Sequence, residues 1–268
     1  MPPIPPTPSP TEAVPARRIA VVGIGAGDPD HLTLGAVRVL NRADAVFLVD
    51  KGEGAADLRR ARVELCTRVI DPAHRWRLVE AELRGVRERD GGDHLGAIAA
   101  WRAERVEAYA QLVRQLAPGE GGAFLVWGDP GLYDGTLAIL DAVRTQHRAQ
   151  FTTEVIPGIS APAALAARHG VALNGPGDAI QITTGRRLAR DGWPAGVDNV
   201  VVLLDTSDAL LGLDEDLCVW WAAYLGLPGE RLVAGRLGDE RERILFERAR
   251  GRERHGWLFD TYLLRRPR

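Results

Sequence analysis

Short apolar runs separated by helical patterns dominate the first half of the chain. The runs at 18–23, 45–49 and 123–127 each stop at, or just before, a glycine or an aspartate. Runs of this kind are typical of parallel strands that are buried on both faces. The spacing of apolar residues predicts helices between them, at 33–41 with Thr33 as N-cap, and at 55–69, 95–117 and 134–147. Strand, helix and strand in this order predict βαβ units.

The second half of the chain starts a further set of elements. Apolar periodicity predicts a helix at 160–169 and strands at 151–155, 179–184, 199–205 and near 257–263. The segment CVWWAAYLG at 218–226 fits a strand and a helix equally well. The charged stretch 71–94 contains Asp-Gly-Gly-Asp at 90–93, so we expect a surface loop there.

These patterns predict an α/β fold with two α/β domains. The N-terminal domain is expected at 18–150 and the C-terminal domain at 151–268. Residues 1–17 are rich in proline, which favours extended conformers over packed structure. We therefore expect a disordered extension before the first domain.

Composition narrows the classes of partner and compartment. The 268 residues are 46% hydrophobic, enough for a sizeable core, and the 34 basic and 36 acidic residues leave a net charge of -2. This balance gives no broad attraction for nucleic acid or anionic membranes. There is no run of about 18 apolar residues and no signal-peptide pattern. Cys66 and Cys218 lie too far apart in sequence to suggest a disulfide framework or a zinc ribbon, so a cytoplasmic protein is expected.

A glycine-rich loop follows the first predicted strand, GIGAGDP at 23–29. Glycines at such a position let the backbone approach a ligand closely. The dinucleotide pattern G-x-G-x-x-G fails here because Asp28 stands where its last glycine is required, and no Gly-Lys-Ser/Thr ending makes a phosphate-binding Walker loop. A tight turn without a ligand is the alternative interpretation.

Two more turns of small residues occur further along the chain. VWGDPGLY at 126–133 follows another predicted strand, and PGISA at 157–161 opens a helix. The carboxyl edge of a parallel sheet is where open α/β folds bind ligands. Three such turns favour a cofactor cleft between the two α/β domains.

The segments GIGAGDPDHLT, VWGDPGLY and VIPGISAPAALAARHG, in this order, resemble the tetrapyrrole methylases over roughly residues 18–265. This resemblance implies a homodimeric enzyme that uses S-adenosyl-L-methionine to methylate a ring carbon of a corrin or sirohaem precursor. The segments VDKG, ITTGRR, WWAAYLGLPGERLVAGRL and HGWLFDTYLL are most similar to members of the family that methylate precorrin-5 at C-1, release acetate and give precorrin-6A.

The resemblance also implies which residues bind the cofactor. They lie in the three turns and at two later strand ends: Gly25, Ala26, Gly27, Gly128, Asp129, Leu132, Ser160, Ala161, Asp205 and Ala234. The family commonly has proline where this chain has Ala26, so the fixed φ of proline is lost in the first loop.

Loss of acetate requires attack of water on a carbonyl, which a general base and oxyanion-stabilising donors assist. Asp50, Lys51 and Tyr133 are the catalytic candidates, and Asp28 and Asp129 are further ones; loop hydrogen bonding or ion pairing is the alternative role for each.

Arg186 and Arg187 follow a predicted strand end and could clamp substrate carboxylates bidentately, the alternative being solvated surface arginines. The six histidines have no ligand spacing, so no metal is predicted, and only His31 lies beside the first loop as a candidate for proton transfer. Trp220 and Trp221 are expected to be structural, in the core or at a dimer interface.

Three other functions stay open at this point. A tetrapyrrole methylase could act on another precorrin position, or on a protein residue as diphthine synthases do. A nucleotide-binding oxidoreductase would use the glycine loops differently, and a homologue without turnover would only sense S-adenosyl-L-methionine.

Overall fold

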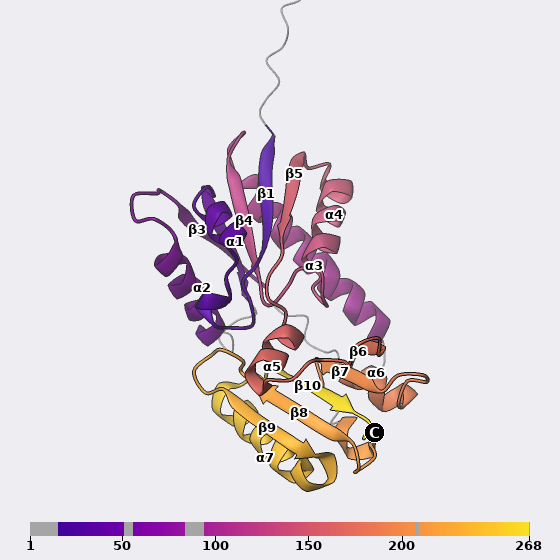
Figure 1. Ribbon diagram of the computed structural model, residues 1–268. Helices are drawn as coiled ribbons and strands as arrows, with labels where there is room; N and C mark the ends of the chain where they lie inside the picture. Colours follow the sequence, from indigo (N-terminus) through magenta and orange to yellow (C-terminus); the bar gives the residue numbers. More distant parts are fainter. Residues whose placement is uncertain (1–15, 51–55, 84–93, 207–208, 268) are drawn as a thin grey trace, which may run out of the picture.

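The chain forms two five-stranded sheets, each covered by helices (Figure 1). The computed structural model describes residues 16–50, 56–83, 94–206 and 209–267. The first sheet has the strand order β3-β2-β4-β1-β5, and all its pairings are parallel. Its strands are β1 (Arg17–Gly23), β2 (Ala45–Asp50), β3 (Arg77–Glu82), β4 (Gly121–Val126) and β5 (Phe151–Ile156).

Side chains of the first sheet alternate between two apolar layers. Ile19 and Val21 point into one core and Ala20 and Val22 into the other, as expected for a strand with a two-residue period. Helices α3 (His94–Arg114) and α4 (Thr136–His147) cover the first layer, and α1 (Leu34–Leu40) and α2 (Ala56–Val69) cover the second. Burial on both faces explains why these strands read as continuous apolar runs.

The second sheet is mixed and has the order β6-β7-β10-β8-β9. Only β6 and β7 are parallel; β10 is antiparallel to β7 and β8, and β8 to β9. Its strands are β6 (Ile180–Thr184), β7 (Asn199–Leu203), β8 (Cys218–Ala223), β9 (Arg231–Arg236) and β10 (Asp260–Arg265).

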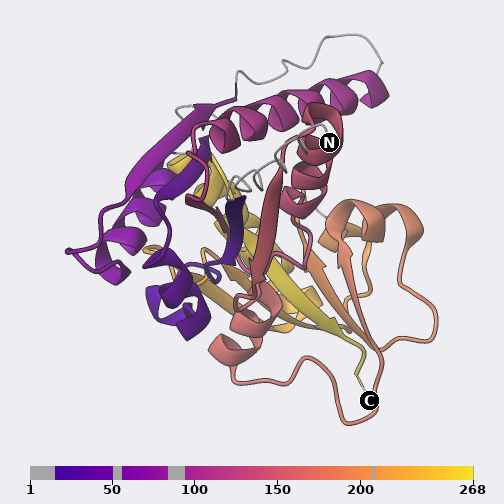
Figure 2. The same cartoon turned by 90° about the horizontal axis from the view of Figure 1, so that it is seen from above.

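Helices also lie on both faces of the second sheet. The core that contains Val200, Trp221 and Tyr262 is covered by α6 (Gly185–Asp191) and α7 (Leu237–His255), and the core that contains Val201 and Leu263 is covered by α5 (Ala161–His169). The short helices η1 (Pro29–His31) and η3 (Ala209–Gly212) complete the described elements. Figure 2 shows the yellow β10 running through the middle of this sheet.

The structure confirms the predicted α/β class and most of the predicted elements. Thr33 caps α1, its Oγ1 accepting from the backbone N–H of Ala36 at 3.1 Å. The ambiguous segment at 218–226 contains strand β8, in which Trp221 is fully buried and Trp220 half-buried under Arg265, so both tryptophans are structural as expected.

The stretch 71–94 contains more than the expected loop, because residues 77–82 form β3 at the edge of the first sheet. The loop signal at 90–93 lies outside the described residues. One expectation requires correction. The strand at 151–156 does not begin the second sheet: it pairs with β1, so the change from one sheet to the other comes after β5. The expected boundary at 150–151 therefore falls inside the first sheet. The proline-rich segment 1–15 lies outside the described residues.

A buried ion pair attaches α7 to the second sheet. Arg248 is fully buried, and its Nε lies 3.0 Å from Oδ2 of Asp260 at the start of β10. The indole N–H of Trp221 donates to the same oxygen at 2.9 Å. Burial raises the pKa of Asp260 from 3.8 to about 6, although Arg248 opposes the shift.

This raised pKa predicts a pH-dependent stability. Because folded Asp260 holds its proton to a higher pH than unfolded aspartate, its contribution is fully present below about pH 4 and is lost as the pH rises through 6. The Asp260→Asn variant should lack this loss, which amounts to at most about 3 kcal/mol. Urea unfolding of both proteins at pH 4 and pH 7 measures the difference, and equal pH dependence in the two proteins would contradict the assignment.

Candidate active site

Three loops meet beyond the carboxyl ends of β1, β4 and β5. At their meeting point Gly23, Gly128 and Gly158 pack backbone against backbone. A Cβ on Gly158 would lie 2.1 Å from the carbonyl oxygen of Gly128, and one on Gly23 would lie 2.5 Å from the nitrogen of Gly158. Neither position leaves room for a side chain. The glycines thus allow the three loops to come together at one point.

Hydrogen bonds hold this arrangement. The amide of Gly128 donates to the carbonyl of Gly25 at 2.7 Å, and the amide of Gly25 donates back at 3.3 Å. Asp129 Oδ1 accepts from the amide of Gly131 at 2.8 Å, while its Oδ2 accepts from the amide of Gly158 at 2.9 Å. The carboxylate of Asp129 therefore joins the second loop to the third. This contact gives the predicted cofactor residue Asp129 a structural role.

The first loop also touches the second sheet. Gly27 has a φ of 154°, and a Cβ there would lie 2.4 Å from the carbonyl oxygen of Leu225, which follows β8. A Cβ on Gly226 would lie 2.3 Å from the amide nitrogen of Asp28. Ala26 packs against the core beneath α5. The predicted residues Gly25, Ala26 and Gly27 accordingly lie where the two sheets meet.

Tyr133 crosses to the second sheet from the GDPGLY loop. Its hydroxyl donates to the carbonyl of Ile182 in β6 at 3.0 Å, and 49% of the residue is exposed. The φ of Tyr133 is 54°, in the left-handed region that non-glycine residues rarely adopt. Nearby, Leu132 donates its amide to the carbonyl of Asp129 at 3.1 Å. The side chain of Tyr133, a candidate for catalysis, is thus partly exposed to solvent where the two sheets meet.

The third loop leads directly into α5. Ser160 is the N-cap residue of this helix and makes no capping hydrogen bond through its side chain, and Ala161 is the first helical residue. Both are half-buried. Proline is tolerated at the second helical position because the first backbone amides of a helix have no partner within it, so the missing N–H of proline costs no hydrogen bond. The hydroxyl of Ser160 therefore does not cap its own helix.

The remaining predicted residues are spread around the second sheet. Asp205 follows β7, is buried, and accepts a hydrogen bond from the hydroxyl of Tyr262 at 2.9 Å. Ala234 is exposed on the edge strand β9. Arg186 and Arg187 are exposed at the start of α6. The side chain of Asp50 and the whole of Lys51 lie outside the described residues; Asp50 ends β2.

Comparison with known proteins assigns the fold and its loops to a family. Residues 18–239 match the tetrapyrrole (corrin/porphyrin) methylases. The chain belongs to this family. The match confirms the resemblance inferred from the three loop sequences, and it covers all three loops and both arginines at the start of α6.

Individual tetrapyrrole methylases match over nearly the whole chain. A precorrin-6A synthase [deacetylating] from Sinorhizobium sp is 38% identical over 252 residues, which cover 93% of this chain and 95% of that protein. The crystal structure of a cobalamin synthesis related protein, CobF, from Corynebacterium diphtheriae has a TM-score of 0.79 and 34% identity, covering 93% of this chain and 98% of that one. A cobalt precorrin-4 methyltransferase, at 18% identity and a TM-score of 0.57, shares the fold.

An aromatic contact that the sequence analysis did not identify also joins the two sheets of this methylase. Trp127, directly before the GDP turn, lies 6.2 Å from Phe259 between ring centroids, and Phe259 lies 4.9 Å from Trp257. Arg62 of α2 lies over the Trp127 ring at 5.4 Å. The sequence does show an aromatic residue next to each of the two strands: Trp127 follows β4, and Phe259 precedes β10. Aromatic contacts of this kind stabilise the packing beyond the contribution of the apolar surface that they bury.

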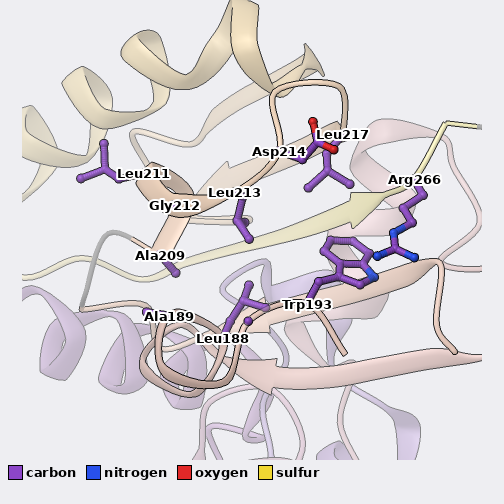
Figure 3. Close-up of a pocket in the computed structure, with 11 residues that line it drawn as sticks. Leu188, Ala189, Trp193, Ala209, Leu211, Gly212, Leu213, Asp214, Leu217 and Arg266 are labelled. Carbon is purple, nitrogen blue, oxygen red and sulfur yellow. The ribbon is translucent and has the colours of Figure 1, made fainter. Parts of the chain in front are cut away.

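A cavity of about 410 Å³ lies away from the three loops, between α6 and the segment 209–217 (Figure 3). Leucine and alanine side chains line it together with Asp214 and Arg266, and Arg266 lies over the ring of Trp193 at 5.2 Å. The meeting point of the three loops is formed instead by backbone atoms that pack against one another. Among the described residues, no three His, Cys, Asp or Glu side chains gather as a metal site, and no helix is long and apolar enough to cross a membrane.

The packing of the three loops predicts that Gly158→Ala is damaging. The added Cβ would overlap the Gly128 carbonyl, so the loops must separate, at a cost of about 1–3 kcal/mol or more. Gly212→Ala is the matched control because a Cβ there meets nothing within 4 Å. We expect a lower Tm and at least tenfold weaker binding of S-adenosyl-L-homocysteine for Gly158→Ala alone, measured by thermal unfolding and calorimetry. Equal behaviour of the two variants would refute the packing argument.

Proposed function

We propose that this chain is a precorrin-6A synthase of the deacetylating type. It would transfer a methyl group from S-adenosyl-L-methionine to C-1 of precorrin-5 and release the extruded acetyl unit as acetate, with water consumed. The observation that carries the proposal is the match to a protein of that name over almost the full length of both chains. The structural similarity to CobF over the same length supports it.

The meeting point of the three loops fits S-adenosyl-L-methionine. Gly23, Gly128 and Gly158 hold the three loops together backbone against backbone. The half-buried residues beside them, Ala26, Gly27, Ser160 and Ala161, are the ones that a cofactor could reach. The residues that would hold the cofactor are those of the three loops, above all 25–27, 128–132 and 160–161. The two further predicted residues fit this role less well, because Asp205 is buried with its carboxylate bonded to Tyr262 and Ala234 lies within the edge strand β9. When bound, S-adenosyl-L-methionine supplies an electrophilic methyl group on its sulfonium.

The protein's part in methyl transfer is positioning. An in-line approach of a ring carbon to the methyl group requires both molecules to be held rigidly, and the fixed loops offer this. Contacts of Gly27 with Leu225 and of Tyr133 with Ile182 close the junction between the sheets and limit the entry of water. The two sheets with their helices would be the two domains, and the cofactor would lie between them.

Release of acetate needs a group that removes a proton from water. Tyr133, Asp50 and Lys51 stay our candidates: Asp50 is the last residue of β2, Lys51 follows it in the sequence, and Tyr133 belongs to the loop after β4. The Tyr133 hydroxyl donates a hydrogen bond to the Ile182 carbonyl and so keeps its proton, which suits it to orient a water molecule by accepting a hydrogen bond rather than to deprotonate it. Asp28 is a weaker candidate, because its carboxylate caps the turn at Asp30.

Arg186 and Arg187 would bind the carboxylates of the tetrapyrrole. They lie at the start of α6, directly after β6, whose Ile182 carbonyl contacts Tyr133. Arg187 forms an exposed ion pair with Asp191 at 3.4 Å, which is weak enough to yield to a ligand. Homodimer formation, which the family resemblance implies, and the cytoplasmic location expected from the sequence also belong to this proposal.

The direct test follows two products of one reaction. Purified chain is incubated with methyl-labelled S-adenosyl-L-methionine and enzymatically generated precorrin-5, and methyl incorporation and acetate are measured together. We expect both at a ratio of about one to one. Methylation without acetate would show that another precorrin position is the target. If neither methyl incorporation nor acetate is detected, the proposal is contradicted. The shorter match to a precorrin-2 C(20)-methyltransferase makes precorrin-2 the comparison substrate.

The arginine clamp predicts a specific kinetic defect. Replacing Arg186 and Arg187 together by alanine should raise KM for precorrin-5 at least tenfold, because two charged contacts to carboxylates are lost. Arg190→Ala is the control, since Arg190 is an exposed arginine in the last turn of the same helix, away from its start, and forms the closer pair with Asp191, at 2.7 Å. Steady-state kinetics measures the effect. An unchanged KM in the double variant, or an equal rise in the control, would show that the clamp does not exist.

A further inference from the structure

A fully buried arginine lies beneath the edge of the second sheet that faces the three loops. Arg248 of α7 has no exposed surface, and two buried carboxylates lie beside it: Asp205 Oδ2 at 3.2 Å from Nη1 and Asp260 Oδ2 at 3.0 Å from Nε. The guanidinium also donates to the backbone carbonyl of Asp205. Burying such charges is costly, and a buried ion pair is weak evidence for net stability. The role of this ion pair is therefore better explained by the residues that it holds in place.

Asp205 is held from several directions at once. Beyond its contacts with Arg248, its Oδ2 accepts from the hydroxyl of Tyr262 at 2.9 Å and its Oδ1 from the amide of Ala209 at 3.4 Å. The preceding residue, Leu204, has a φ of 52° and is 56% exposed. A left-handed backbone at a leucine persists only where its surroundings fix it. The Arg248–Asp205 pair supplies this restraint.

The same carboxylate packs against the turn that starts α6. A Cβ on Gly185 would lie 2.0 Å from Asp205 Oδ1 and 2.3 Å from its Cγ, so the backbone of Gly185 rests directly on the carboxylate. The next residues in the helix are Arg186 and Arg187, both exposed. The position of the two arginines thus depends on where Arg248 holds Asp205.

We propose that Arg248 and Asp205 are positioning residues, which hold the start of α6 so that Arg186 and Arg187 meet the carboxylates of the tetrapyrrole substrate. This inference rests on the proposed function for the nature of the substrate. Neither residue contacts the substrate itself: Arg248 is buried beneath the edge, and the Asp205 carboxylate is occupied by protein donors.

The test compares variants on one helix and one nearly isosteric change. Asp205→Asn keeps the volume beside Gly185 but removes the charge that pairs with Arg248, and Arg248→Met removes the guanidinium. Arg241→Met is the control: Arg241 is also mostly buried on α7, but its partners are Glu215 at 3.2 Å and the carbonyl of Leu213 at 2.9 Å. Kinetics are measured at a temperature where thermal unfolding shows every variant to be folded.

We expect Asp205→Asn and Arg248→Met to raise KM for precorrin-5 at least tenfold and to change kcat less than threefold. The control should lower Tm without changing KM. A merely structural role would affect Tm and leave KM alone, so a KM within twofold of wild type in Asp205→Asn would overturn the proposal. An equal rise of KM in the control would do the same. Asp205→Asn decides the question if Arg248→Met does not fold.

Binding of uroporphyrin III, a stable tetrapyrrole with carboxylate side chains, separates this proposal from the proposed function. If the wild-type chain fails to convert precorrin-5 but binds uroporphyrin III, and Asp205→Asn and Arg248→Met bind it more weakly while Arg241→Met does not, the proposed function is contradicted and the positioning role is supported. Unchanged binding in Asp205→Asn would overturn the positioning role. A wild-type chain that binds neither tetrapyrrole would overturn both.

Discussion

The contact between Asp129 and the backbone of Gly158 is the constraint on which the site depends. One carboxylate accepts from its own loop and from the next one, and the glycines between them leave no space for side chains. The three loops can meet only because β1, β4 and β5 are neighbours in a parallel sheet and end at the same edge. The packed glycines bring the three loops to one point at this edge of the first sheet.

A second requirement is that the other sheet faces this edge. Backbone contacts of the first loop with the 225–227 turn, the hydrogen bond of Tyr133, and the ring contact of Trp127 with Phe259 fix the two sheets against each other. The buried Arg248 fixes the facing edge from below. In the proposed function, the two sides of this junction would have separate tasks, cofactor binding on the first sheet and substrate orientation on the second.

The sequence predicted the central strands of the first sheet, which are buried on both faces, and it missed the edge strand β3 and the charged helix α7. The runs that became β1 and β4 were unmistakable, because nearly every residue in them faces a core. Strand β3 was missed because RLVEAE is an edge strand with polar residues among its apolar ones. Helix α7 was not predicted either: it is rich in arginine and glutamate, and only Leu237, Ile244, Arg248 and Gly251 are buried. A buried arginine gives no apolar signal, so the Arg248 network required coordinates.

The loops of the site were evident from glycine spacing, but their contacts were not, since sequence carries no information on which amide meets Asp129. The account is tested most directly by a crystal structure of the chain with S-adenosyl-L-homocysteine. It predicts a ligand in contact with residues 25–27, 128–132 and 160–161 at the junction of the two sheets. A ligand bound elsewhere, for instance in the cavity beside Trp193, with the three loops untouched, would contradict it.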